Sequence, residues 1–182
     1  MKNSISENYK GDIGLTEYFQ AGPYTDTFSR KSLENILNSE DFRNVILNWV
    51  TFFMNNYCDV LHDDYTHPKY VNINERYNNS KEHISLNLSD EQINYYLVNF
   101  SLPQLYCIFF GYWYGLSDEE VTFYARKNWN DEKMTEIINM LIVYDIPYSE
   151  IYDLFSHSFN KKNLKNLLRK YGWTQGNFSL LL

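Results

Sequence analysis

A pattern of helix caps that recurs along the chain constrains its fold more than any other feature. Ser89 and Ser117 each stand three residues before a glutamine or a glutamate, which is the capping box that satisfies free backbone amides at a helix start. The two serines are 28 residues apart, and Pro147 takes the corresponding position 30 residues after Ser117. The spacing therefore predicts three units of similar length, each of which opens on a helix.

Each predicted unit contains a second helix start. The caps of these second helices follow an aromatic residue and precede an apolar residue by four positions, at Ser101, Asn130 and Asn160. This is the spacing of a hydrophobic staple. Apolar residues fall 4, 7, 8 and 11 positions after each cap, on one face of a helix. The sequence predicts three helical-hairpin repeats over about residues 87–172, each of which buries its apolar face on its neighbours.

The N-terminal residues suggest a different kind of element. Short alternations on either side of Gly11 predict a small β-hairpin over residues 4–19, with a disordered arm as the open alternative. If the hairpin forms, aromatic faces and positive charges near the N-terminus make a plausible RNA-contact set. The candidate contact residues are Lys2, Tyr9, Lys10 and Tyr18.

The rest of the N-terminal part, residues 1–86, is expected to pack against the repeats as a helical layer. A short helix over residues 29–38 and a long amphipathic helix over 40–62 follow from the apolar spacing. Residues 63–86 are predicted to form a long connection, broken by Pro68 and Asn78-Asn79, with a short strand at KYVNI. The expected fold is mainly α, and the two parts, 1–86 and 87–182, form one compact unit.

The charges divide the chain into an acidic body and a basic end. The 23 acidic residues all lie at or before Asp153 together with 11 basic residues, a balance of −12. No acidic residue follows Asp153, but five basic ones do: Lys161, Lys162, Lys165, Arg169 and Lys170. These five fall away from the apolar face of the predicted last helix and favour contact with phosphates or with an acidic protein patch. The alternative is the polar outer face that any terminal repeat requires.

One cluster of reactive side chains follows the long helix. Cys58 and His62 are four residues apart, and Asp64 and His67 come directly afterwards. Cys58, His62 and His67, with Asp64, are candidate ligands of a tetrahedral zinc ion. In a second hypothesis, His62 and His67 serve as general acid and base on a ribose-phosphate backbone, with Asp64 beside them. The third interpretation is an ordinary polar helix end that needs neither metal nor cofactor, and it is the one that we favour.

The sequence also predicts where the protein acts. The longest largely apolar run, Leu105 to Leu116, is shorter than the roughly 20 residues of a membrane span. The N-terminus is polar, and the two cysteines, Cys58 and Cys107, lie in helical patterns that suit reduced thiols. A soluble cytoplasmic protein with no membrane association is expected.

The middle unit carries a resemblance to known proteins. It resembles a helical-hairpin repeat common in small proteins of Gram-positive mobile elements, at Gly115, Leu116, Ser117, Glu120, Val121, Tyr124, Ala125, Trp129, Asn130, Met134 and Ile137. With its size, acidity and distinct N-terminal part, the whole chain resembles type II anti-CRISPR proteins of such elements. The resemblance implies that its partners are a type II CRISPR effector nuclease and the guide RNA, without a small-molecule substrate. An acidic body suits the positive channel of that nuclease.

Three functions remain open at the level of the sequence. The first is an inhibitor that binds the nuclease and its guide RNA. The second is a ribonuclease, or an activator of cleavage, that shortens the guide RNA. The third is a helical-repeat adaptor or regulator of a mobile element with no role in CRISPR. The chain has no recognisable catalytic motif, so enzymatic activity stays an open question.

Overall fold

The computed structural model describes residues 26–58 and 68–171, and every regular element in these ranges is helical. Its α-helices are α2 (Asp26–Leu37), α3 (Glu40–Cys58), α4 (Pro68–Asn79), α5 (Asp90–Asn99), α6 (Leu102–Tyr114), α7 (Asp118–Tyr124), α8 (Asp131–Ile138), α9 (Tyr148–Asp153) and α10 (Lys161–Lys170). Two π-helical stretches, η2 (Asn139–Val143) and η3 (Leu154–Ser158), continue α8 and α9. The predicted mainly α class is confirmed for this part of the chain, and the predicted hairpin 4–19 lies outside it.

The helices from α5 onward begin where the caps predict. The hydroxyl of Ser89 accepts the N–H of Gln92 at 3.2 Å, and the Gln92 side chain accepts the N–H of Ser89 at 2.9 Å. Ser117 and Glu120 repeat this capping box at the start of α7. The other predicted caps precede α6, α8 and α10, at Ser101, Asn130 and Asn160. One such cap stabilises a helix by about 1 kcal/mol through bonds to residues within the next turn. The position of each helix start therefore depends on residues that are close in the sequence.

The expected connection 63–86 contains a helix, and the strand predicted at KYVNI is wrong. Helix α4 begins at Pro68 and ends at Asn79, so the residues read as breaks are its two ends. Proline is favoured in the first turn of a helix, where its missing N–H costs nothing. Ile73 is fully buried, and Tyr77, one turn later, packs on the core. Helix α4 packs against α3, which supplies the apolar surface that stabilises so polar a helix.

The side chains of two arginines, Arg30 and Arg43, connect the N-terminal helices to neighbouring segments. Helix α2 packs on α5, where Arg30 lies 2.5 Å from the Asp90 carboxylate. Arg43 of α3 donates to the carbonyls of Ser80, Lys81 and Glu82 after α4, the shortest distance being 2.6 Å to Lys81. The predicted helices 29–38 and 40–62 correspond to α2 and α3, and α3 is described as far as Cys58.

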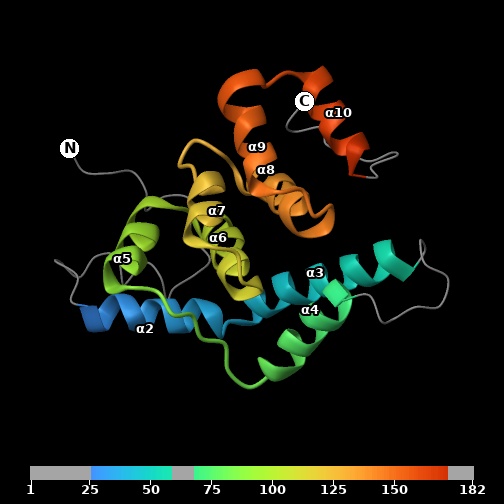
Figure 1. Cartoon of the computed structure of the whole chain (residues 1–182). Helices are drawn as coiled ribbons and strands as arrows, with labels where there is room; N and C mark the ends of the chain where they lie inside the picture. Colours follow the sequence, from blue (N-terminus) through green and yellow to red (C-terminus); the bar gives the residue numbers. More distant parts are fainter. Residues whose placement is uncertain (1–25, 59–67, 172–182) are drawn as a thin grey trace, which may run out of the picture.

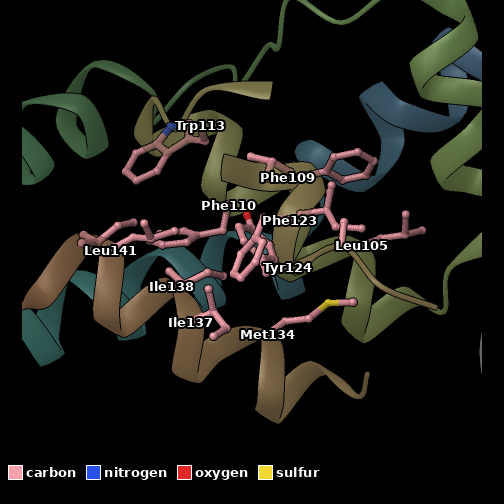
Figure 2. Close-up of a cluster of buried hydrophobic side chains, with 14 of the residues drawn as sticks. Leu105, Phe109, Phe110, Trp113, Phe123, Tyr124, Met134, Ile137, Ile138 and Leu141 are labelled. Carbon is pink, nitrogen blue, oxygen red and sulfur yellow. The ribbon is translucent and has the colours of Figure 1, made fainter. Parts of the chain in front are cut away.

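Helix α6 is the centre of the fold. It contacts α3, α7 and α8, which explains why its sequence is apolar nearly all round. Figure 2 shows rings from α6 and α7 directed toward aliphatic side chains of α8 and η2. Phe109, Phe110, Tyr124 and Ile137 in this cluster are completely buried. Helix α10 lies at the opposite end of the molecule from α2, as the red and blue ends of Figure 1 show.

Two glycines, one within α6 and one directly after it, permit close packing. Gly111 faces the Tyr124 ring, and a Cβ at this position would lie 1.9 Å from the Tyr124 hydroxyl. Gly115 ends the helix with a φ of 107°, a left-handed conformation that favours glycine. Beside it, Arg76 of α4 donates to the Trp113 carbonyl at 2.9 Å and so satisfies the C-terminal end of α6. The approach of α6 to α7 and α4 therefore depends on these two positions.

Candidate binding surface on helix α10

Most residues that were predicted to act in catalysis, metal binding or RNA contact lie outside the described part of the chain. These are the candidate acid–base and metal residues His62, Asp64 and His67, and the candidate contact residues Lys2, Tyr9, Lys10 and Tyr18. Cys58 is the last residue of α3. Within residues 26–58 and 68–171, no group of three or more His, Cys, Asp and Glu side chains is placed to hold a metal ion. The zinc and acid–base hypotheses for residues 58–67 therefore stay predictions.

Helix α10 brings the five predicted basic contact residues together. The Asn160 side chain caps the helix by accepting the N–H of Asn163 at 2.9 Å. Leu164 and Leu168 are fully buried and anchor the helix to the body. All five basic residues are exposed: Lys161, Lys162, Lys165, Arg169 and Lys170. The helix thus turns an apolar face inward and a cationic face outward.

One of these cations already has a partner within the protein. Lys170 Nζ lies 2.8 Å from both carboxylate oxygens of Glu150 on α9, and the Tyr171 hydroxyl donates to Glu150 Oε1 at 2.5 Å. The bonds from Lys170 and then Tyr171 lower the pKa of the Glu150 carboxyl, and the same carboxylate raises the pKa of Lys170. The C-terminal end of α10 is therefore tied to α9.

This tie predicts a pH dependence that Glu150→Gln should reduce. A carboxyl with a lowered pKa in the folded state stabilises the fold above its unfolded pKa of about 4.3, and this stabilisation is lost as pH falls through the folded pKa. The wild type should therefore lose more free energy of unfolding than the variant between about pH 5 and pH 3. Urea unfolding at both pH values measures the difference. Asp153→Asn, which removes an exposed carboxylate from the same helix, is the control; an identical pH dependence in wild type and Glu150→Gln would contradict the assignment.

The other four cations form no ion pair with any residue in 26–58 or 68–171, where the ion pairs are Arg30–Asp90 and Lys170–Glu150. Helix α10 contains no acidic residue. Lys161 and Lys162 occupy its first turn, where the partial positive charge of the helix dipole disfavours cations. Folding alone therefore does not favour these two lysines at their positions. A bound anion would remove the unfavourable interaction.

Cys107 is a structural thiol. Burial raises its pKa to about 11, and its Sγ lies 3.5 Å from the Thr135 hydroxyl and from the Asp131 carbonyl of α8. At neutral pH the thiol is therefore protonated and a poor nucleophile. Cys107 therefore packs as a small, largely buried residue between α6 and α8.

The structure also assembles an aromatic cluster that spacing along the chain did not single out. The rings of Phe123, Trp129 and Phe155 lie 5.8 to 6.4 Å apart, although they come from α7, the turn before α8, and η3. The guanidinium of Arg126 lies 5.0 Å from the Phe123 ring centre and 4.6 Å from that of Trp129. The sequence signal was the high aromatic share of 18%, which does not indicate which rings meet.

The character of the helices and three comparisons with known proteins bear on the choice of function. None of the helices in the described ranges has the length and apolar character needed to cross a membrane. No protein-family model matches the chain, and neither a similar curated protein nor a similar solved structure was found. A function can therefore be inferred only from the charged and aromatic surfaces described above and from the sequence resemblance.

Proposed function

We propose that this chain inhibits a type II RNA-guided DNA nuclease in the cytoplasm by binding the nuclease and its guide RNA. Helix α10 is the observation that carries the proposal. It exposes Lys161, Lys162, Lys165 and Arg169 without an ion pair to any described residue. A phosphate backbone would neutralise all four, since cations along one face of a helix can follow successive phosphates. This proposed contact needs neither a cofactor nor a small-molecule substrate.

The acidic body supports the nuclease as the second partner. Exposed carboxylates occupy the first turns of three helices that precede α10. They are Glu91 of α5, Asp118 and Glu119 of α7, and Glu132 of α8. A nuclease of this class holds its guide and target in a strongly positive channel. Charges of opposite sign on the two partners accelerate association and orient the complex. The acidic helices would face the protein, and α10 would face the RNA.

We also infer that α5 to α10 form three helical-hairpin units, α5–α6, α7–α8 and α9–α10. The shared caps support this inference, as do the positions four residues after each second cap. Leu105, Met134 and Leu164 stand at these positions and are at most 3% exposed. In such an array the terminal unit has a free outer face on which a partner can bind. Helix α10 would provide that face.

The test is an order-of-addition cleavage assay. The protein is incubated with guide RNA, with and without the nuclease, before target DNA is added, and DNA and RNA are then run on denaturing gels. Lost DNA cleavage with intact RNA supports the proposal. Shortened RNA would instead support guide cleavage, and its dependence on the nuclease would show which protein supplies the active site. DNA cleavage that is unaffected in every order would leave the adaptor as the function.

The triple substitution Lys161→Glu, Lys162→Glu and Lys165→Glu tests the RNA contact. Each lost phosphate contact on a single strand lowers the slope of log affinity against log salt concentration by about 0.7. We therefore expect the slope for guide RNA to fall by about 2 and the affinity at low salt to fall by at least about tenfold. Fluorescence anisotropy with labelled guide RNA at five salt concentrations measures both quantities.

A matched triple variant controls for net charge. Lys31→Glu, Lys81→Glu and Lys127→Glu make the same change in charge at exposed lysines outside α10. Circular dichroism establishes that both triple variants remain folded. If the two variants lower the affinity and the slope equally, the effect is one of overall charge, and α10 is not the RNA contact.

A further inference from the structure

A groove lies between α7 and α9, apart from the cationic face of α10. It has a volume of about 500 Å³. Its lining includes Asp118, Glu119, Phe123, Arg126, Tyr148 and Tyr152. Helix α7 supplies the two acids and Phe123, and α9 supplies the two tyrosines. Its apolar and charged groups come from two helices about 30 residues apart in the sequence.

The apolar lining of the groove is made of aromatic rings that contact one another. The ring centre of Phe123 lies 5.5 Å from that of Tyr148 and 6.0 Å from that of Tyr152, and the two tyrosines are 5.8 Å apart. Phe123 is only 6% exposed, whereas Tyr152 is 46% exposed. A ligand in the groove therefore meets the Tyr152 ring first. The faces of such rings attract cations.

The charges at one end of the groove are negative. Asp118 and Glu119 are exposed in the first turn of α7, and neither forms an ion pair with a residue in the described ranges. Asp118 accepts a bond from Gln92 Nε2 at 3.0 Å, and it also acts on the Tyr112 hydroxyl, whose pKa is raised by burial first and then by neighbours that include this carboxylate. Both partners are neutral, so the charge of Asp118 stays in place. The dipole of α7 contributes only about half a positive charge at this end. The pKa of the Tyr148 hydroxyl is raised by burial first and then by Glu119, so this carboxylate acts on the tyrosine side of the groove.

The cation of the groove, Arg126, forms no ion pair with Asp118 or Glu119. Arg126 follows the C-terminal end of α7, whereas the two acids occupy its first turn. Its guanidinium packs over Phe123 and Trp129, and its Nε donates to the Phe123 carbonyl at 2.9 Å. Arg126 also demonstrates that a guanidinium fits against the aromatic surface beside the groove.

We propose that the groove between α7 and α9 binds an exposed arginine side chain of a protein partner. A guanidinium is planar, so it can stack on Tyr152 and donate paired hydrogen bonds to Asp118 or Glu119. Nucleic acid is a poor occupant of this end, because its phosphates would meet two carboxylates. The identification of that partner with the nuclease rests on the proposed function, but the chemistry of the groove does not.

The probe for the experiment is the peptide Gly-Gly-Arg-Gly-Gly with blocked ends, and its control is the same peptide with citrulline in place of arginine. Citrulline keeps the shape of the side chain and removes its charge. Titration of isotope-labelled protein, followed by NMR, should show peak shifts at Thr122 and Tyr152 with the arginine peptide. Binding should be at least about fivefold weaker with citrulline, because both the ion pair and the cation–π contact are lost.

Variants locate the site. Asp118→Asn with Glu119→Gln should weaken binding of the arginine peptide about fivefold or more, and Tyr152→Ala about threefold. Glu34→Gln with Glu75→Gln removes two exposed charges from α2 and α4 and should leave the affinity within about twofold. Arg126→Gln should not weaken binding.

Two outcomes would overturn the groove proposal. One is equal binding of the arginine and citrulline peptides. The other is a loss of binding with Arg126→Gln but not with the two acid substitutions, which would indicate an anionic occupant. Because the peptide assay contains neither nuclease nor RNA, its failure is separate from failure of the cleavage assay. The groove can hold an arginine even if the partner is not a nuclease.

Discussion

Gly111→Ala is expected to destabilise the protein by about 2–3 kcal/mol, although the same change at a typical helix position is favourable by about 0.5–1 kcal/mol. The added Cβ would lie 1.9 Å from the hydroxyl oxygen and 3.2 Å from the Cζ of Tyr124. Tyr124 cannot move aside easily, because it is completely buried and its hydroxyl donates to the Cys107 carbonyl at 3.2 Å. Urea unfolding of the variant at neutral pH measures the loss.

A second substitution separates this clash from a general effect on α6. Tyr124→Phe removes the hydroxyl that the new Cβ would meet, at a cost of about 1 kcal/mol for the lost hydrogen bond. The double variant should therefore be more stable than Gly111→Ala alone. Each single substitution lowers the free energy of unfolding, but the coupling free energy between the two is stabilising. A Gly111→Ala protein as stable as the wild type would show that α6 and α7 do not approach each other as described.

Phe110→Ala is expected to cost about 3–5 kcal/mol, the largest effect among the single substitutions considered. Phe110 is fully buried, and its ring stacks on Trp49 of α3 with centres 4.7 Å apart and planes inclined by 14°. Its ring also lies 5.8 Å from Trp113. Removal of the ring would leave a cavity where the N-terminal helices meet α6. Thermal and urea unfolding measure the loss, and tryptophan fluorescence, to which Trp49 and Trp113 contribute, reports the change in packing around Phe110.

Phe159→Ala is the matched control for this prediction. It makes the same chemical change at a ring that is 44% exposed and stacks on Phe155 at 4.7 Å. Loss of one aromatic pair at such a site costs about 0.5–1.5 kcal/mol. If the two variants were equally stable, Phe110 would not be the anchor between α3 and α6.

The helix starts from α5 onward could be predicted because a cap is a local interaction. Ser89 and Ser117 bond to groups three residues away, so the residues that decide these helix starts are adjacent in the sequence. The cationic face of α10 was predictable for the same reason, since its lysines and leucines lie on one helix. The mainly α class followed from these local signals.

Helix α4 was missed because its sequence is polar and its stabilisation is not local. Its buried side, including Ile73, is covered by α3, and Arg76 makes its bond to Trp113, 37 residues away. In isolation a helix of 12 residues is marginal in water. Pro68 and Asn78-Asn79 were interpreted as breaks in a connection, and the sequence alone did not reveal that they enclose a helix.

The same distinction separates the two proposed binding surfaces. By itself, the sequence determined the capped helices, the apolar stripes and the basic end, because these depend on neighbours within a few residues. Only the tertiary structure decided which of the five cations is used internally, by placing Glu150 beside Lys170. It also created the groove, since Phe123 and Tyr152 meet only when α7 and α9 pack together. Contacts between distant helices depend on how their side chains fit together in three dimensions. The spacing of residues along the sequence does not show which side chains will meet.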